Sequence, residues 1–121
     1  MNTDSPAAPR LRGIWMGVAD LARSRAFYER LDARFDEARQ TESMAVATLG
    51  GTMLGVEEAP DGRSNGGPAP FFDVADADAL HADLLAAGFE VEGPPADEPW
   101  GRQFNVRDPN GHLIAFVGPV Q

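Results

Sequence analysis

The sequence predicts an α+β fold made of two tandem βαβββ modules, which form curved mixed sheets with helices on the outer face. Two observations predict this fold. A strand pattern, an aspartate and a helical pattern follow one another twice, around Asp20 and around Asp76. The segments 51–56 (Gly-Thr-Met-Leu-Gly-Val) and 111–116 (Gly-His-Leu-Ile-Ala-Phe) also align. A duplicated module explains both, and it leaves one face of each sheet without a helix and able to curve into a cleft.

The first module opens with a strand and a helix. Residues 12–18 form a short apolar run typical of a strand. Asp20 follows as an N-cap, because its carboxylate can accept a hydrogen bond from a backbone amide of the first helical turn. The helix is predicted over residues 21–31, with Phe27 and Leu31 on its buried face.

A hairpin and a change of composition complete this module. Strands are predicted at 44–49 and 52–56, joined by a tight Gly50-Gly51 turn. The residues that follow are rich in Pro, Gly, Asp, Ser and Asn without periodicity, which is typical of a linker. We therefore predict a single domain over 1–121, with one module at about 11–58, a linker at about 59–69 and a second module at about 70–118.

The second module repeats the order of the first. Residues 71–74 predict a strand, and Asp76 predicts the cap of a second helix. Leu80 and Leu84 share one face of this helix, since residues four apart lie one above the other. Gly88 is expected to end it, because glycine accepts the left-handed conformation common after a helix, and a strand begins at residue 89.

Residues 99–117 predict a complete β-hairpin. Phe104 and Val106 alternate with polar neighbours, as in a strand with one buried face. Residues 108–111 (Asp-Pro-Asn-Gly) form a turn signal, with proline at the second position and glycine where φ can be positive. Apolar residues then resume over 113–117, so the chain is expected to end its second module with this strand.

Composition limits the classes of function. The chain has 121 residues, no cysteine and a net charge of −9, and all ten of its basic residues are arginine. Disulfides, thiolate metal sites and a cysteine nucleophile are therefore excluded. The acidic balance disfavours binding to nucleic acid or to anionic lipid. With no signal-peptide pattern and no apolar run of about 18 residues, we expect a cytoplasmic protein without membrane contact.

Two segments carry a resemblance to a known family. Residues 18–28 (Val-Ala-Asp-Leu-Ala-Arg-Ser-Arg-Ala-Phe-Tyr) and 99–111 (Pro-Trp-Gly-Arg-Gln-Phe-Asn-Val-Arg-Asp-Pro-Asn-Gly) resemble the vicinal oxygen chelate superfamily, which includes glyoxalase I, extradiol dioxygenases and bleomycin-resistance proteins. The Pro-Trp-Gly, Asp-Pro and Gly elements look most like the bleomycin-resistance branch. The resemblance implies a homodimer whose concave sheets hold a divalent metal or a small molecule.

The resemblance also implies where metal ligands would stand. In the metal enzymes of this family, His, Glu or Gln ligands lie near the start of the first strand and on the last strand of each module. Counting back from the two capping aspartates places the first-strand positions at Gly13 and Ala69, and the last-strand positions fall on Gly55 and Ala115. None of these residues has a donor side chain. His81 and His112 are predicted to lie away from the cleft, and the lone carboxylate of Glu57 makes no metal site.

If these four positions face the cleft, alternation along the strands defines the two faces of the sheets. The cleft face then also includes Trp15, Met53, Glu57, Phe71, Asp73, Leu113 and Val117, with Gln103 and Asn105 as its polar groups. The helix face is predicted to form the core from Ile14, Met16, Val18, Leu54, Val56, Phe72, Val74, Ile114 and Phe116, joined by Phe27, Leu31, Leu80, Leu84, Phe104 and Val106. The cleft is thus expected to be largely apolar and aromatic.

These observations favour a metal-free protein without a cofactor that binds a small molecule. We expect it to sequester an aromatic or amphipathic antibiotic or other natural product, including a cationic one, and so to confer resistance by binding. The predicted ligand contacts are Trp15, Met53, Glu57, Phe71, Trp100, Gln103, Asn105 and Leu113. Interface or core packing is the alternative role for Trp15 and Phe71, and fixing a loop is the alternative for Trp100.

Two other functions remain open at this point. One is a metal-dependent lyase, isomerase or dioxygenase of the glyoxalase type. The other is a cleft that serves only as a dimerisation or regulatory surface. No serine has a histidine placed to activate it, so catalysis by a serine nucleophile is not predicted. No glycine-rich loop precedes a helix, so a phosphate-binding loop is not predicted either.

Overall fold

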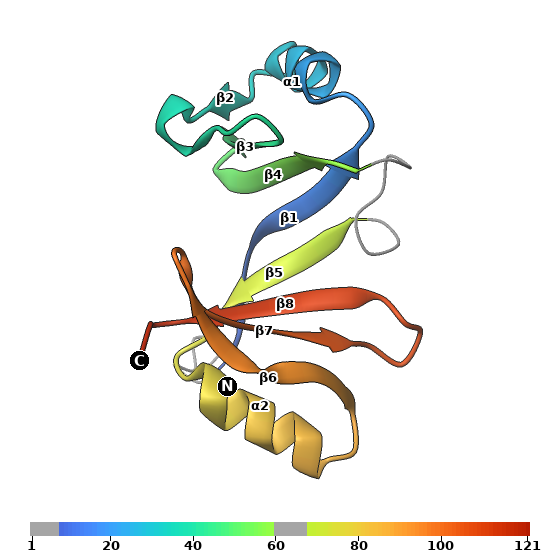
Figure 1. The fold of residues 1–121 in the computed structure, drawn as a ribbon, viewed down its shortest axis with the longest axis vertical. Coiled ribbons are helices and arrows are strands. Elements are labelled where there is room, and N and C mark those ends of the chain that lie inside the picture. The colour runs from blue at the N-terminus through green and yellow to red at the C-terminus, as the bar shows by residue number, and fades with distance from the viewer. Residues whose placement is uncertain (1–7, 60–67) are drawn as a thin grey trace. The chain divides into compact units, whose positions relative to one another are not determined.

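A computed structural model describes residues 8–59 and 68–121 of the chain (Figure 1). The chain forms two compact units, Arg12–Ala69 and Pro70–Gln121, the second counted together with residues 8–11. The predicted linker falls largely on residues 60–67, outside the described residues. Among the described helices, none is long and apolar enough to cross a membrane.

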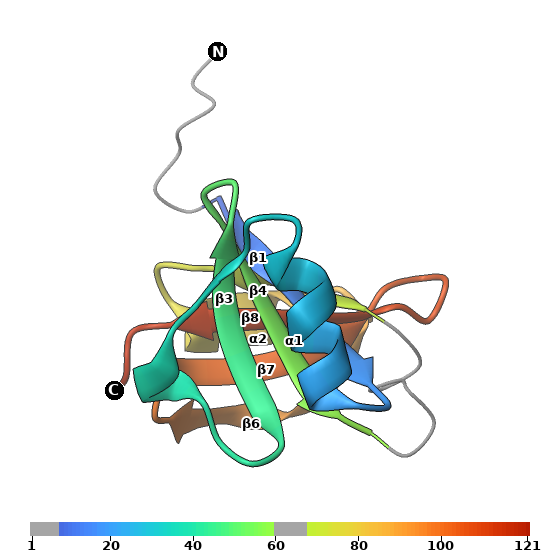
Figure 2. The ribbon, with the colours of Figure 1, turned by 90° about the horizontal axis from the view of Figure 1, so that it is seen from above.

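The first unit is a four-stranded mixed sheet with one helix on one face. Its strands lie in the order β2-β3-β4-β1, with β1 parallel to β4 and the other neighbours antiparallel. Helix α1 lies against β3 and β4 (Figure 2). The elements are β1 (Arg10–Val18), α1 (Leu21–Glu29), β2 (Arg34–Phe35), a 3-10 turn (Glu37–Arg39), β3 (Met44–Leu49) and β4 (Thr52–Glu58).

Helix α1 begins as predicted but buries a different face. The Asp20 side chain accepts a hydrogen bond from the Arg23 backbone amide at 3.0 Å, as expected of an N-cap. The helix packs Leu21 and Tyr28 against the core, and residues seven apart lie on the same face after two turns. The prediction that Phe27 and Leu31 join the core was wrong: their exposed fractions are 59% and 51%. Phe27 lies one residue off the buried face, and Leu31 follows the end of the helix.

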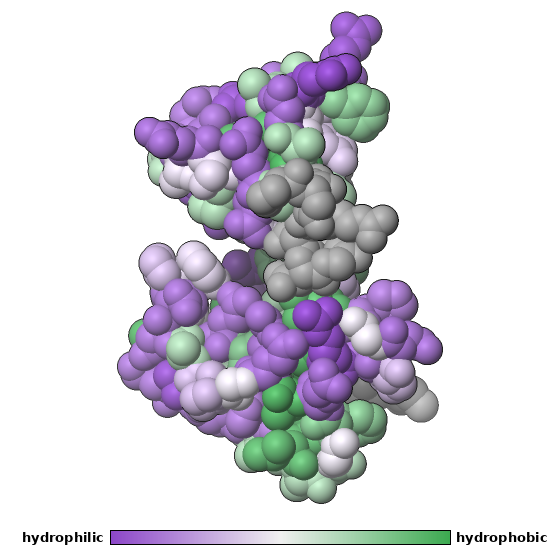
Figure 3. Space-filling view, turned by 45° about the vertical axis from the view of Figure 1, so that its right-hand side comes forward, coloured by the Kyte–Doolittle hydropathy of each residue, from purple (hydrophilic) through white to green (hydrophobic). Residues whose placement is uncertain are grey.

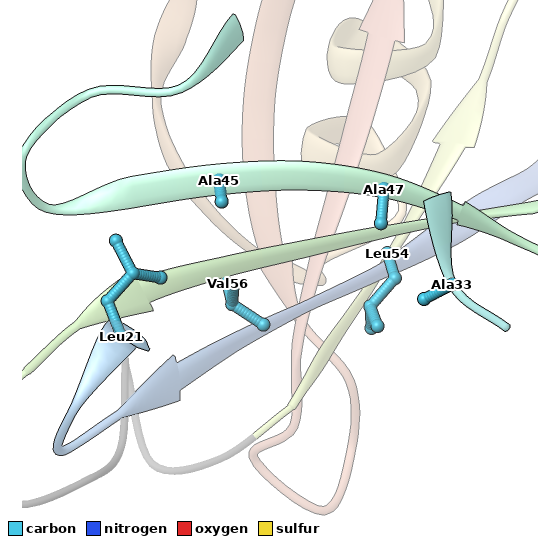
Figure 4. Close-up of a cluster of buried hydrophobic side chains, with 6 residues drawn as sticks. All are labelled: Leu21, Ala33, Ala45, Ala47, Leu54 and Val56. Atoms are coloured by element: carbon cyan, nitrogen blue, oxygen red, sulfur yellow. The ribbon is translucent and has the colours of Figure 1, made fainter. Parts of the chain in front are cut away.

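The core of the first unit lies between α1 and the sheet. Figure 4 shows its six buried side chains, which are Leu21, Ala33, Ala45, Ala47, Leu54 and Val56. Met16 and Val18 pack against them as predicted, whereas Ile14 is 40% exposed and was wrongly placed in the core. Because Leu54 and Val56 face the helix, the alternate residues of β4 lie on the opposite side of the sheet.

The second unit repeats this architecture. Its strands lie in the order β5-β8-β7-β6, with β5 parallel to β8 and the other neighbours antiparallel. Helix α2 lies against β6, β7 and β8. The elements are β5 (Ala69–Asp73), α2 (Ala77–Ala86), β6 (Glu90–Glu98), β7 (Gly101–Arg107) and β8 (Leu113–Gly118). The predicted α+β fold of two βαβββ modules is confirmed.

The two units also agree in the register of their strands. Trp15 stands opposite Gly55 in the parallel pair of the first unit, and Phe71 stands opposite Ala115 in that of the second. The sequence alignment of 51–56 with 111–116 likewise makes Gly55 and Ala115 equivalent. The predicted repeat therefore holds residue by residue on the strands where the expected ligand positions lie.

Aromatic rings fill the space between α2 and its sheet. The Phe104 side chain is 3% exposed, and its ring centroid lies 5.4 Å from that of Phe116, which in turn stacks on Phe72 at 5.6 Å. The His81 ring meets Phe104 edge-on at 5.2 Å, and its Nε2 lies 2.7 Å from the carbonyl oxygen of Gly93. His81 is thus part of this packing, on the helix side where it was predicted.

Strand β6 is longer than the sequence indicated. It continues to Glu98 through two prolines, which lack the amide that a ladder hydrogen bond needs. The pairing of β6 with β7 shifts between Glu92 and Ala96, and Gly93 within this interval has a φ of +63°. A bulge of this kind lets the prolines lie in the strand without breaking the pairs on either side.

Apolar side chains near the end of α2 are exposed. Leu85 is 57% exposed and Phe89 is 48% exposed. Figure 3 shows hydrophobic residues gathered in its lower part, at the end of the unit that α2 occupies, with hydrophilic residues over much of the remaining face. This region lies on the helix side of the second unit.

The β7–β8 turn is held by one carboxylate. Asp108 Oδ1 accepts hydrogen bonds from the backbone amides of Asn110 and His112, each at 2.9 Å. Gly111 has a φ of +87° and donates to the Asp108 carbonyl at 2.8 Å, which confirms the predicted turn. The pKa of Asp108 lies below its ordinary value because these groups favour the charged carboxylate. The hydrogen bond from the His112 amide is the largest cause, and the Asn110 amide and the His112 ring add to it.

This lowered pKa predicts how the turn responds to acid. A carboxylate whose pKa is lower in the folded state stabilises the fold above its unfolded pKa, and this contribution is lost as the pH falls through the folded pKa. The Asp108→Asn variant keeps the Oδ1 acceptor but cannot titrate. We expect wild type to be more stable than Asp108→Asn at neutral pH, and the difference to shrink below pH 3.8, the ordinary value for the group. Denaturant unfolding at a series of pH values measures this, and a difference that stays constant with pH would contradict it.

Candidate functional site

We call the sheet surface opposite the helix the site face of each unit. On the site face of the first unit, the indole of Trp15 covers Gly55. A Cβ atom built on Gly55 would lie only 2.1 Å from Trp15 Cε3 and 2.3 Å from Cζ3. The space that a side chain at this position would occupy is therefore filled by the tryptophan ring.

A hydrogen bond fixes the orientation of this ring. Trp15 Nε1 donates to Glu57 Oε1 at 2.7 Å, and both side chains are partly buried. Hydrogen bonds with a charged acceptor contribute more than neutral ones, about 1.5–3 kcal/mol. Trp15 is thus held at two points, by the backbone of Gly55 under one ring face and by Glu57 at its polar edge.

The second expected ligand position of this unit is closed by backbone. A Cβ atom on Gly13 would lie 2.1 Å from the Met53 carbonyl oxygen and 2.8 Å from its carbonyl carbon. Met53 itself is partly buried on the site face, opposite Gly13 in the β1–β4 pair. Any side chain at Gly13 would require β1 and β4 to move apart.

The site face of the second unit has an apolar part and a polar part. Phe71 and Leu113 are buried, with 8% and 7% of their surfaces exposed, and Ala69, the first residue of β5 at the boundary of the two units, is buried as well. Ala115 is partly exposed and stands between Phe71 on β5 and Asn105 on β7. A row of aromatic, small and amide side chains therefore crosses this face.

Three side chains form a hydrogen-bonded series along the polar part. Trp100 Nε1 donates to Gln103 Oε1 at 2.5 Å, and Gln103 Nε2 donates to Asn105 Oδ1 at 3.0 Å. Trp100 lies just before β7 and is 51% exposed. The sequence placed Gln103 and Asn105 on one face by alternation, but it did not indicate that Trp100 donates a hydrogen bond to Gln103.

The structure thus gathers the predicted site residues into one group in each unit. Trp15, Met53 and Glu57 share the site face of the first, and Phe71, Leu113, Gln103 and Asn105 share that of the second, with Trp100 bound to its edge. What the sequence missed is how Trp15 uses the space over Gly55. The sequence carried no signal for this, because Trp15 and Gly55 become neighbours only through the pairing of β1 with β4.

The two histidines lie elsewhere. His81 is on the helix side, and His112 lies in the β7–β8 turn with its Nδ1 3.2 Å from Asp108 Oδ2. Over residues 8–59 and 68–121, no group of three or more His, Cys, Asp or Glu side chains could hold a metal ion.

Comparison with known proteins identifies the family. The family model described as Glyoxalase/Bleomycin resistance protein/Dioxygenase superfamily matches residues 10–116. The chain therefore belongs to this superfamily, in agreement with the resemblance of its two motifs. No curated protein sequence matches the chain.

Solved structures with this fold include proteins of different activities. A superfamily member from Vibrio splendidus 12B01 is 20% identical, with 92% of this chain and 99% of that chain covered and a TM-score of 0.75. Methylmalonyl-CoA epimerase from Mycobacterium tuberculosis is 19% identical, with 100% and 94% covered and a TM-score of 0.74. An extradiol ring-cleaving dioxygenase from B. fuscum is 20% identical, with 100% and 36% covered and a TM-score of 0.74. At these identities the likeness shows the fold alone.

Solved structures with this fold also include a Mn(II)-bound glyoxalase from Novosphingobium aromaticivorans. At the four positions that the family resemblance implies for metal ligands, the residues of this chain do not fit a metal. Gly13, Gly55, Ala69 and Ala115 carry no oxygen, nitrogen or sulfur in their side chains. In the first unit, backbone and indole also fill the space that a ligand side chain would need.

Proposed function

We propose that this chain is a metal-free binding protein that sequesters a planar aromatic or amphipathic natural product, such as an antibiotic, and confers resistance by binding. The observation that carries the proposal is the Trp15 indole, fixed between Gly55 and Glu57. No ring or cation among the described residues stacks on its outer face. A fixed flat ring with one face unstacked is suited to hold a second flat ring.

The energetics of such a site are favourable. Stacking on an aromatic ring contributes about 0.5–1.5 kcal/mol beyond the burial of area. A ring that is already held in one orientation loses little further freedom when a ligand binds, so more of the contact energy appears as affinity. Sequestration at roughly micromolar Kd requires about −8 kcal/mol, which aromatic stacking and apolar burial together can supply.

Charge favours a cationic or neutral ligand over an anionic one. The chain has a net charge of −9, and the carboxylate of Glu57 stands at the polar edge of Trp15. An acidic surface raises the local concentration of cations and repels anions. We therefore include cationic aromatic compounds in the proposed ligand class. We also propose that the protein is a homodimer, as the family resemblance implies, and that it is cytoplasmic.

Native mass spectrometry of purified protein tests the proposal. The protein is prepared without chelator and incubated with anthracyclines, mitomycins, bleomycins and enediyne-type compounds. We expect a dimer mass, a stoichiometric complex with at least one compound and no bound divalent ion. One stoichiometric divalent ion, checked by elemental analysis, would overturn the metal-free proposal in favour of a metal-dependent lyase, isomerase or dioxygenase. Absence of binding across the panel would favour a surface used only for dimerisation or regulation.

A further inference from the structure

The hydrogen-bonded series on the second unit has a fixed direction. An indole N–H can only donate, so Gln103 must turn its carbonyl oxygen toward Trp100. The amide nitrogen of Gln103 then faces Asn105, which must accept with its own carbonyl oxygen. Trp100 therefore determines the orientation of both amides.

The series ends in a donor that is still available. The Asn105 Nδ2 group carries two hydrogens, and no acceptor among the described residues of its unit takes them. No described side-chain nitrogen or oxygen is both buried and without a partner, so this unpaired nitrogen is accessible. Asn105 thus offers N–H donors with a defined orientation to a molecule on the site face.

The surroundings of this donor suit a flat molecule. Asn105 stands opposite Ala115, which stands opposite Phe71, so all three lie on one face in one row. Ala115 is small and partly exposed, so its methyl group is the only side chain that stands between the phenyl ring and the amide in this row. In the first unit the equivalent of Asn105 is Val46, which has no donor, and the space over Gly55 holds Trp15.

We propose that Asn105 donates hydrogen bonds to a carbonyl or quinone oxygen on the edge of a planar ligand that lies over Ala115 beside Phe71. Trp100 is a positioning residue, which acts through Gln103 to keep the Asn105 donors turned toward the ligand. This inference rests on the proposed function and narrows its ligand class to planar compounds with an acceptor edge. A carbonyl fits better than a carboxylate, because the net charge of −9 disfavours anions.

Two matched probes test the inference: an anthraquinone and an anthracene that carry the same trimethylammonium side chain. They share shape, charge and stacking area but differ in the two carbonyl oxygens. We expect wild type to bind the anthraquinone about threefold to tenfold more tightly in calorimetric titrations, the range that one or two neutral hydrogen bonds give. The quantity compared among variants is the ratio of the two dissociation constants.

Two variants test whether the ratio of dissociation constants depends on the hydrogen-bonded series of Trp100, Gln103 and Asn105. Asn105→Leu keeps the volume and removes the donor, so the ratio should fall to about one while the affinity for the anthracene is kept. Trp100→Phe keeps a ring but removes the indole N–H, which frees the amides of Gln103 and Asn105 to reverse, so the ratio should also fall. Melting temperatures show that both variants fold, and Phe27→Ala on the helix side of the other unit is the control that should leave the ratio unchanged.

The outcomes separate this inference from the proposed function. Equal binding of both probes by wild type would overturn the inference and leave the proposed binding function supported. If Asn105→Leu keeps the wild-type ratio of dissociation constants, the inference is also overturned, because the preference for the anthraquinone would then arise from other residues. Binding of neither probe, together with silence across the natural-product panel, would count against the proposed function itself.

Discussion

Replacing Trp15 with alanine is expected to weaken the binding of a planar aromatic compound roughly 30-fold to 150-fold, the equivalent of about 2–3 kcal/mol. The variant loses the stacking surface and the area that the ligand buries against it. It also leaves Glu57 without the indole donor that lies 2.7 Å away. Fluorescence or calorimetric titration of the compound that binds in the mass-spectrometric panel measures the change.

Two further variants distinguish stacking from general loss of structure. Trp15→Phe keeps an aromatic ring but loses the hydrogen bond to Glu57, so it should retain part of the affinity. Phe27→Ala removes an exposed aromatic ring of the same unit on the helix side, and it should bind like wild type. If Trp15→Ala folds and binds as tightly as wild type, Trp15 serves packing or an interface, and the site must be sought elsewhere.

Much of the fold could be predicted because it is encoded locally. Asp20 and Asp76 cap helices, and Gly111 takes a positive φ in the turn where it was expected. These features depend on a few adjacent residues and on backbone preferences. Strand alternation likewise separated Phe104 and Phe116 on the helix side from the residues on the site face.

The errors in the predicted fold arose where tertiary contacts determine which face of an element is buried or how far the element extends. The helical pattern of residues 21–31 allows more than one apolar face, and packing against β3 and β4 selected the face with Tyr28 and left Phe27 exposed. The extension of β6 through its prolines depends on a bulge at Gly93 that its neighbours along the chain do not reveal. In both cases the deciding partners lie on other strands.

In the candidate site, too, local features could be predicted from the sequence and features that depend on tertiary contacts could not. The sequence identified four small residues in register and the apolar character around them, since both follow from the repeat and from alternation. It did not indicate what fills the space over Gly55, because that depends on the rotamer of Trp15 and its bond to Glu57. The direction of the amide series likewise requires the contact of Trp100 with Gln103, which the alternation of strand residues does not contain.

The close approaches at Gly13 and Gly55 predict different responses to the same substitution. Alanine in place of either glycine should destabilise the fold by about 1–3 kcal/mol, as overpacking does, and Gly13→Ala should lie at the upper end or beyond it. At Gly13 the added methyl meets the Met53 carbonyl, which is backbone and cannot turn aside without moving β4. At Gly55 it meets the indole of Trp15, a side chain that can be removed.

A double-mutant comparison by denaturant unfolding tests this difference. In a Trp15→Ala background, Gly55→Ala should cost almost nothing, because the ring that it would meet is gone and a strand gains from losing a glycine. Gly13→Ala should keep its full cost in a Met53→Ala background, since the carbonyl and Cβ of residue 53 remain. Rescue of Gly13→Ala by Met53→Ala would contradict the backbone contact, and failure to rescue Gly55→Ala would contradict the placement of Trp15. The expected pattern means that a metal ligand could not be restored at position 13 by substitution alone, and at position 55 only at the expense of the aromatic surface.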